Sequence, residues 1–65
     1  MRILLKQVRE QRNLSIRQVE ILTKVSKSTI SDIETGKVIP RLDVLEQLAA
    51  GLKVKISDLI ESEYL

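Results

Sequence analysis

The sequence predicts an all-α fold of five short helices with brief connections. Apolar residues recur at spacings of three and four along most of the chain, which is the period of an amphipathic helix. Asn, Ser, Gly and Pro fall between these periodic stretches, where helices begin and end. Almost every apolar side chain is Leu, Ile, Val or Ala, and Tyr64 is the only aromatic residue.

The first two helices are bounded by polar residues that favour helix ends. We expect the first over residues 2–12, with Leu5 and Val8 on one face and Asn13 at a left-handed end. Ser15 is a favourable N-cap for the second helix. The apolar stripe of the second helix ends within two turns, so this helix is expected to be short.

The third helix follows after only a brief turn. Ser26 provides its N-cap, and Gly36 marks its end. Ile30 and Ile33 supply its buried face. Because only these two apolar residues hold the helix, most of its other side chains are expected to face outward.

Two further helices complete the predicted fold. The fourth is expected over residues 41–51, with Gly51 marking its end. The fifth is expected to begin at Ser57, its N-cap, and to run through Leu59 and Ile60. No linker or internal repeat interrupts the pattern, so we expect residues 1–65 to form a single domain.

Residues 15–36 carry the most informative pattern. Two short helices joined by a turn of a few residues cannot lie antiparallel, so they must cross steeply as a helix-turn-helix. The first polar side chains of the second helix then protrude and can enter a major groove of DNA. Lys27 can donate to guanine, the hydroxyls can donate or accept at base edges, and Asp32 can accept from cytosine. The residues expected to read bases are Lys27, Ser28, Thr29, Ser31 and Asp32.

Charge is distributed unevenly along the chain. Residues 1–41 carry nine Lys or Arg and four Asp or Glu, a balance of +5, whereas residues 42–65 carry two and five, a balance of −3. These balances sum to the net charge of +2. A basic first part is typical of a domain that faces a polyanion, and double-stranded DNA is the partner we expect.

Composition argues against several functional classes. The chain contains no Cys and no His, so it lacks thiolate ligands, disulfides and the commonest general base. No apolar run approaches the roughly 18 residues needed to cross a membrane, and Lys6 and Arg9 interrupt the apolar start. We therefore expect a cytoplasmic protein that is not an enzyme and has no cofactor, metal, membrane or small-molecule substrate.

The segment VSKSTISDIETGK, residues 25–37, resembles the recognition-helix segment of the Cro and phage-repressor proteins, also called the xenobiotic-response-element (XRE) family. The likeness extends over nearly the whole chain. The other matching positions are Leu5, Val8, Arg9, Leu14, Ser15, Pro40, Leu42, Leu45, Leu48, Ala49, Leu52 and residues 56–59. The resemblance implies a five-helix, lambda-repressor-like DNA-binding domain of a transcription regulator, with repression as the expected outcome.

The resemblance also implies roles for individual residues. Lys27, Ser28, Thr29 and Asp32 would read bases. The residues that would contact the DNA backbone are Ser15, Ile16, Arg17, Thr35, Lys37 and Arg41. Arg9 and Glu34 match a pair that forms a partly buried salt bridge in relatives. Removing one partner of such a pair costs roughly 3–5 kcal/mol when the pair is well buried.

Three positions depart from the family pattern. Relatives usually carry Gln, Ala and Gly where this chain has Ile16, Glu20 and Lys24. Ile16 cannot donate the side-chain hydrogen bond that Gln gives to phosphate. Glu20 must reach outward or spread the two helices. Lys24 in a left-handed turn costs on the order of 1 kcal/mol or more.

One such domain reads only a few base pairs, so we expect a homodimer on two half-sites about 34 Å apart. The expected interface residues are the apolar side chains of the last helix: Leu59, Ile60, Tyr64 and Leu65. Val38 and Ile39, in the loop before the fourth helix, are a second option.

An alternative function is that of an antitoxin or controller protein that acts mainly by binding a protein partner. The third helix is mildly acidic, with Lys27 against Asp32 and Glu34, which is consistent with this alternative. The two functions predict different salt dependence, because a DNA-binding protein loses affinity steeply as salt rises.

Overall fold

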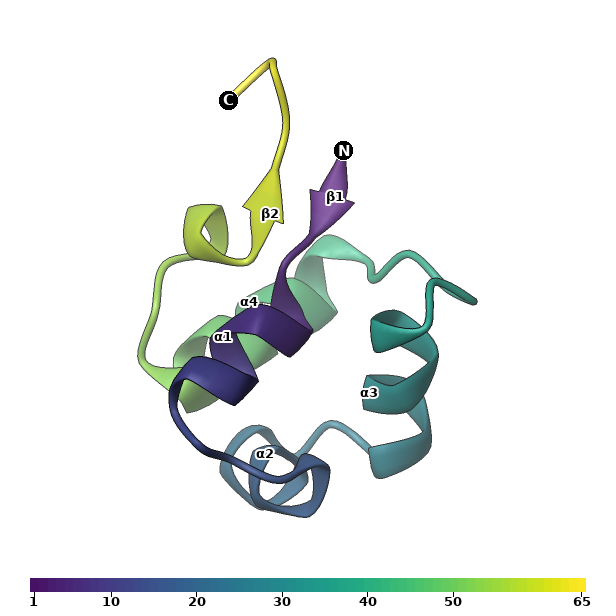
Figure 1. Cartoon of the computed structure of the whole chain (residues 1–65), viewed down its shortest axis with the longest axis vertical. Helices are drawn as coiled ribbons and strands as arrows, with labels where there is room; N and C mark the ends of the chain where they lie inside the picture. The colour runs from purple at the N-terminus through teal and green to yellow at the C-terminus, as the bar shows by residue number, and fades with distance from the viewer.

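Four α-helices and a small two-stranded sheet make up the fold (Figure 1). A computed structural model describes all 65 residues of the chain. In chain order the elements are β1 (Arg2–Ile3), α1 (Leu5–Gln11), α2 (Ile16–Thr23), α3 (Lys27–Glu34), α4 (Leu42–Leu52), the 3₁₀ turn η1 (Ile56–Asp58) and β2 (Ile60–Glu61). The mostly helical class agrees with the prediction, and α2 and α3 are the two consecutive short helices expected there.

The two ends of the chain differ from the prediction. The fifth expected helix, from Ser57 onward, is instead a single 3₁₀ turn followed by β2, so there are four α-helices rather than five. The first helix begins at Leu5 rather than at residue 2. Ile3 lies opposite Ile60 in an antiparallel pair. Because β-branched residues pack well across paired strands, the chain start joins the C-terminal segment instead of extending α1.

The end of α1 and both ends of α2 and α3 lie close to where the sequence predicts them. Ser15 and Ser26 are the N-caps of α2 and α3, and each hydroxyl accepts the main-chain N–H three residues later. Asn13 adopts a left-handed conformation with φ 56° after α1. Gly36, with φ 80°, turns the chain after α3. Local turn chemistry therefore sets the limits of the two central helices.

Gly51 has a different role from the expected one. It lies inside α4, which continues to Leu52 and is followed by Lys53 in a left-handed conformation. A Cβ atom at residue 51 would lie 2.6 Å from the carbonyl oxygen of Leu22 and 2.6 Å from Cγ2 of Thr23. Gly51 therefore lets α4 approach the end of α2 more closely than any side chain would allow.

One apolar core joins the four helices. Its buried members are Leu5, Val19, Val25, Ile30, Ile33, Leu45, Leu48, Ala49, Leu52 and Leu59. The burial of Leu59 corrects the expected dimer interface, because this side chain fills the core of its own protomer and offers no surface to a partner. None of the helices has the length and the apolar character that crossing a membrane requires.

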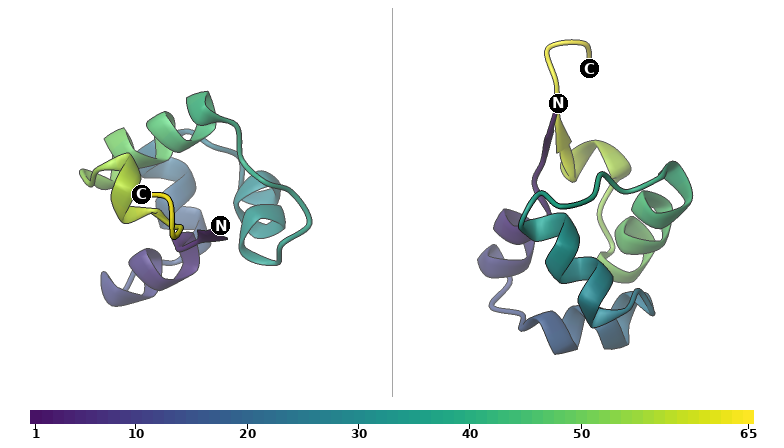
Figure 2. Two further views of the ribbon diagram at one scale, coloured as in Figure 1. Left: turned by 90° about the horizontal axis from the view of Figure 1, so that it is seen from above. Right: turned by 90° about the vertical axis from the view of Figure 1, so that its right-hand side faces the viewer.

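The arrangement leaves one face of α3 uncovered. In Figure 1 the two termini lie at one end of the molecule, whereas α2 and the first turn of α3 lie at the other end. The right-hand view of Figure 2 shows α3 in front, with no other element crossing it. Ile30 and Ile33 attach the opposite side of α3 to the core. One side of α3 is therefore fixed to the core, and the opposite side faces solvent.

Candidate nucleic-acid interface

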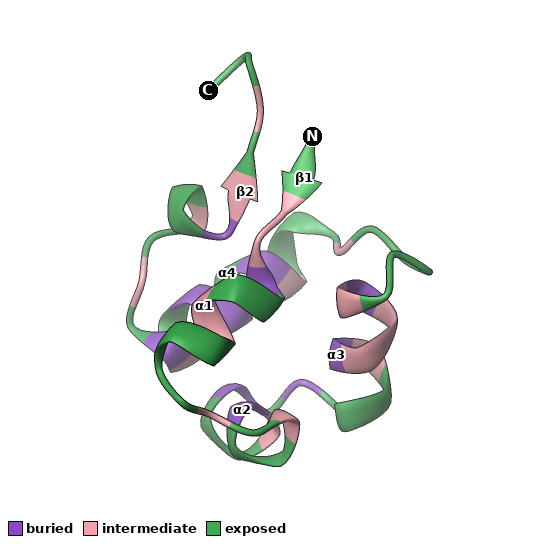
Figure 3. Ribbon diagram, viewed as in Figure 1, coloured by how far each residue is buried: buried purple, intermediate pink, exposed green.

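The first turn of α3 is the most exposed part of this helix (Figure 3). Lys27 and Ser28 are exposed, and Thr29 is half-buried. Ile30, the next residue, is completely buried. The polar residues at the start of α3 therefore protrude from the body, while the residue that follows them anchors the helix.

Three hydroxyl groups gather at the start of α3. Ser26 Oγ accepts the main-chain N–H of Thr29 at 3.2 Å and donates to Thr29 Oγ1 at 2.8 Å. Ser28 Oγ lies 3.4 Å from Ser26 Oγ, which is too long for a strong O–H···O bond. The hydroxyl protons of Ser28 and Thr29 therefore remain available to an outside acceptor.

Ser31 and Asp32 lie one turn further along α3, and both are half-buried. Neither side chain has a hydrogen-bond or ion-pair partner within the protein. The main-chain oxygen of Asp32 accepts the N–H groups of Lys37 at 2.9 Å and Val38 at 3.3 Å, which folds the following loop back onto the helix. The carboxylate of Asp32 is therefore left for a partner outside the chain.

The start of α2 lies at the same end of the molecule as the start of α3. A capping box closes it: Ser15 Oγ accepts the N–H of Gln18 at 3.0 Å, and Gln18 Oε1 accepts the N–H of Ser15 at 2.7 Å. The main-chain N–H groups of Ile16 and Arg17 have no partner. The Ile16 side chain packs against the core, so this residue can offer a phosphate only its N–H. Arg17 is exposed and can also offer its guanidinium.

The other side of α3 carries the remaining expected backbone contacts. Lys37 is exposed and makes no ion pair within the chain. Arg41 Nε lies 3.4 Å from Asp43 Oδ1 in a largely exposed pair, which holds the guanidinium only weakly. The Thr35 hydroxyl already donates to the carbonyl of Ser31 at 2.9 Å. Thr35 therefore offers no hydroxyl proton to a phosphate in this conformation.

Arg9 and Glu34 form a bidentate ion pair between α1 and α3. Nε and Nη2 of Arg9 donate to the two carboxylate oxygens at 2.8 and 3.0 Å, and the side chains are only 13% and 6% exposed. The hydrogen bonds to Glu34 are the main cause that raises the pKa of Arg9 above its ordinary value. Nη1 also donates to the carbonyl of Leu14 at 2.9 Å. The guanidinium thus joins α1, the loop before α2 and the end of α3.

The turn between α2 and α3 depends on a contact that the sequence did not reveal. Glu20 Oε2 accepts the main-chain N–H of Lys27 at 2.8 Å. Glu20 is half-buried, and its side chain caps the start of α3 instead of spreading the helices. Lys24 adopts the left-handed conformation, with φ 61°. The only sign of this contact in the sequence is an acidic residue about one turn before the end of α2. The N–H group that it binds belongs to Lys27, seven residues later.

Two further polar side chains stabilise this region, and neither was singled out from the sequence. Thr23 is 3% exposed. Its hydroxyl donates to the carbonyl of Val19 at 2.7 Å and accepts the N–H of Val25 at 3.2 Å, which bridges the turn. Arg12 donates to the carbonyl of Leu52 at the end of α4. Thr23 thus gives the N–H of Val25 a partner in the turn, and Arg12 satisfies a carbonyl that the end of α4 leaves without one.

The outward face of α3 carries balanced charge. Glu34 is buried in its ion pair, so only Lys27 and Asp32 remain as charges on the exposed side of the helix. The acidic excess of α3 that favoured a protein partner is therefore absent from its surface. The exposed cations of the neighbouring segments are Arg17, Lys24, Lys37 and Arg41.

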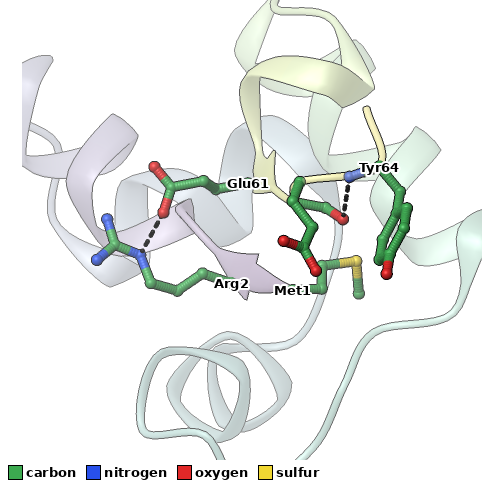
Figure 4. Close-up of a pocket in the computed structure, with 6 residues that line it drawn as sticks. Met1, Arg2, Glu61 and Tyr64 are labelled. Carbon is green, nitrogen blue, oxygen red and sulfur yellow. Dashed lines mark hydrogen bonds and ion pairs between the residues drawn. The ribbon is translucent and has the colours of Figure 1, made fainter.

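The larger of two surface depressions, of about 450 Å³, lies at the chain ends, away from the first turn of α3 (Figure 4). Arg2 Nε lies 3.2 Å from Glu61 Oε1 there, in an exposed pair that adds little stability. Of the expected dimer residues in this segment, Tyr64 and Leu65 are exposed, whereas Ile60 is half-buried in the sheet. The C-terminal segment thus offers fewer contacts to a partner than the sequence suggested.

Residues 1–60 match the family model of the helix-turn-helix domain. The chain therefore belongs to the helix-turn-helix domain family. It is also similar to a protein of Deinococcus deserti, the HTH-type transcriptional regulator DdrOP3, with 30% identity over 57 residues. The matched region covers 88% of this chain and 44% of that protein, so the chain spans less than half the length of this relative.

Proposed function

We propose that this chain is a sequence-specific transcription regulator that binds double-stranded DNA with α3 in the major groove. The observation that carries this proposal is the exposed polar first turn of α3, held from behind by Ile30 and Ile33. Membership of the helix-turn-helix family supports it. Within that family we assign residues 1–65 to a single domain of the Cro and phage-repressor (XRE) type, because residues 25–37 resemble its recognition helix.

The base-reading surface consists of the α3 side chains whose donor or acceptor groups remain available to DNA. Lys27 donates to guanine O6 and N7, and the hydroxyls of Ser28 and Thr29 reach neighbouring base edges. Ser31 and Asp32 lie one turn behind them, and Asp32 accepts from cytosine N4. The same carboxylate repels phosphate and thereby disfavours wrong registers.

Phosphate contacts flank this surface on both sides. Before it, the unpaired N–H groups of Ile16 and Arg17 at the start of α2 bind one strand of the backbone. Ser15 adds its hydroxyl proton there. After it, Lys37 and Arg41 reach the backbone across the groove. These contacts position the domain, while the side chains of α3 select the sequence.

We further propose that the active form is a homodimer that represses transcription. The longest dimension of one protomer is 31 Å, so a single copy covers one half-site when half-sites repeat every 34 Å or so. A dimer doubles the number of base pairs that are read. Occupation of an operator by this dimer would then exclude other proteins from the same DNA.

The exposed apolar side chains beside Met1 are the best-supported dimer surface. Met1 lines one groove together with Val38 and Ile39 and a second depression together with Tyr64. Ile39 and Met1 are each 75% exposed. Tyr64 from the first dimer option and the loop residues Val38 and Ile39 from the second therefore lie beside the same residue, Met1. This surface leaves the first turn of α3 uncovered.

Selection of bound duplexes from random DNA tests the proposed function. We expect an inverted repeat with a fixed distance between its half-sites. Affinity for the selected duplex should fall steeply as salt rises, because each phosphate contact releases a counterion. Recovery of no common sequence, together with affinity that does not respond to salt, would contradict the proposal and favour a protein partner.

A further inference from the structure

Glu20 connects the two helices of the helix-turn-helix at a single residue. Its carboxylate accepts the main-chain N–H of Lys27, at the start of α3, at 2.8 Å. Its own carbonyl oxygen accepts the N–H of Lys24, at the end of α2, at 2.7 Å. Glu20 is half-buried, and its hydrogen bond to Lys27 lies at the surface of the molecule. A change in the angle between the helices would stretch the bond to Lys27, whereas the bond to Lys24 closes the end of α2 itself.

The bond from Lys27 to Glu20 completes the cap that Ser26 begins. Ser26 Oγ binds the N–H of Thr29, and its carbonyl accepts the first helical hydrogen bond of α3. With Glu20 in place, only the N–H of Ser28 lacks a partner in the first turn. A helix start with several unpaired N–H groups attracts phosphate whatever the DNA sequence. At the start of α3 the carboxylate of Glu20 occupies the place where a phosphate would otherwise bind.

We propose that Glu20 is a positioning residue that raises the sequence specificity of α3, an inference that rests on the DNA-binding function proposed above. The hydrogen bond fixes the main chain of Lys27 relative to α2, so the Lys27 side chain enters the groove at a defined position. The negative charge opposes phosphate at the start of α3, which weakens binding to every sequence alike. The hydrogen bond is therefore the contact that raises the ratio of specific to non-specific affinity, whereas the charge lowers both affinities together.

Two substitutions separate the hydrogen bond from the charge. Glu20→Gln keeps an acceptor oxygen and removes the charge, whereas Glu20→Ala removes both. Glu46→Gln is the matched control, because Glu46 is exposed on α4 and makes no ion pair. The readouts are the affinities for the selected duplex and for an unrelated duplex of equal length at the same salt concentration.

We expect both Glu20 variants, but not Glu46→Gln, to bind the unrelated duplex a few-fold more tightly. We expect Glu20→Ala also to bind the selected duplex about fivefold more weakly than Glu20→Gln, since alanine lacks the acceptor oxygen that glutamine still offers to the N–H of Lys27. In the protein without DNA, the amide proton of Lys27 should exchange slowly in the wild type and in Glu20→Gln, and quickly in Glu20→Ala.

Three results would overturn the inference, each in a different way. If the wild type binds its selected duplex while Glu20→Ala keeps the wild-type ratio of affinities, Glu20 does not set specificity and this inference alone is wrong. If the wild type binds no duplex in a salt-dependent manner, the proposed function is wrong and the inference falls with it. The positioning role would also be contradicted if the Lys27 amide proton exchanged as slowly in Glu20→Ala as it does in the wild type.

Discussion

At its C-terminal end α3 is held by a buried ion pair, whereas at its N-terminal end it is held by exposed hydrogen bonds. Glu34 is 6% exposed and binds Arg9 through both carboxylate oxygens. Lys27 and Ser28, at the other end, are exposed and contribute no side chain to the core. The two ends of one eight-residue helix therefore differ in burial and in the strength of their contacts.

This difference shows how a short helix can be both well fixed and open to a ligand. Buried contacts at one end, with Ile30 and Ile33 in the middle, hold the helix, while the side chains of Lys27 and Ser28 in the first turn add nothing to the core. The side chains of the first turn can therefore vary to suit a ligand without loss of core packing. Substitutions at the C-terminal end should therefore alter stability, and substitutions at the N-terminal end should alter DNA binding.

The largest expected effect is that of Glu34→Ala. This change leaves the buried guanidinium of Arg9 without its carboxylate, which should lower the free energy of unfolding by about 3–5 kcal/mol. Urea denaturation measures the loss. Glu46→Ala, an exposed glutamate on α4, should stay within about 0.5 kcal/mol of the wild type. A loss below about 1 kcal/mol for Glu34→Ala would mean that the C-terminal end is not the main anchor.

Ser26→Ala should have a smaller effect at the opposite end. The change removes the hydroxyl that accepts the N–H of Thr29, and loss of an N-cap costs about 1 kcal/mol. The same urea titration measures it, with Ser26→Asp as a variant that should restore the cap. If Ser26→Ala destabilises the protein as much as Glu34→Ala does, the proposed difference between the two ends of α3 is wrong.

The smallest expected effect is a gain in stability from Lys24→Gly. Lys24 has a left-handed backbone with φ 61°. Relief of that strain should raise the free energy of unfolding by at most about 1 kcal/mol, because the greater freedom of Gly in the unfolded chain offsets part of the gain. Lys53→Gly, at φ 58° outside the helix-turn-helix, is the matched comparison. Thermal unfolding should show a similar small rise in Tm for both. A fall in Tm for Lys24→Gly would show that the turn needs the lysine side chain.

Much of the central fold could be predicted from local chemistry. Ser15 and Ser26 mark helix starts because each hydroxyl accepts a main-chain N–H three residues later. Gly36 marks a helix end because glycine readily adopts the positive φ that the turn requires. Ile30 and Ile33 could be placed in the core because their spacing matches one helix face. Such signals act over one or two turns, which is the range that a sequence pattern describes well.

The contacts that were missed join residues far apart in the chain. The pairing of β1 with β2 brings Ile3 to Ile60, and a 3₁₀ turn followed by β2 replaces the expected last helix. Leu59 was expected at a dimer surface, but it lies between the 3₁₀ turn and β2 and is buried in the core. The bond from Lys27 to Glu20 likewise depends on the angle between two helices. No local propensity specifies these distances.

The most direct test of base reading by the first turn of α3 compares Lys27→Ala with Lys6→Ala, which removes an exposed lysine from α1. Affinities for the selected duplex and for an unrelated duplex are measured at one salt concentration. We predict that Lys27→Ala weakens binding to the selected duplex by about 1–3 kcal/mol and binding to the unrelated duplex much less, while Lys6→Ala leaves the ratio unchanged. Equal losses on both duplexes for Lys27→Ala would contradict the base-reading role of α3.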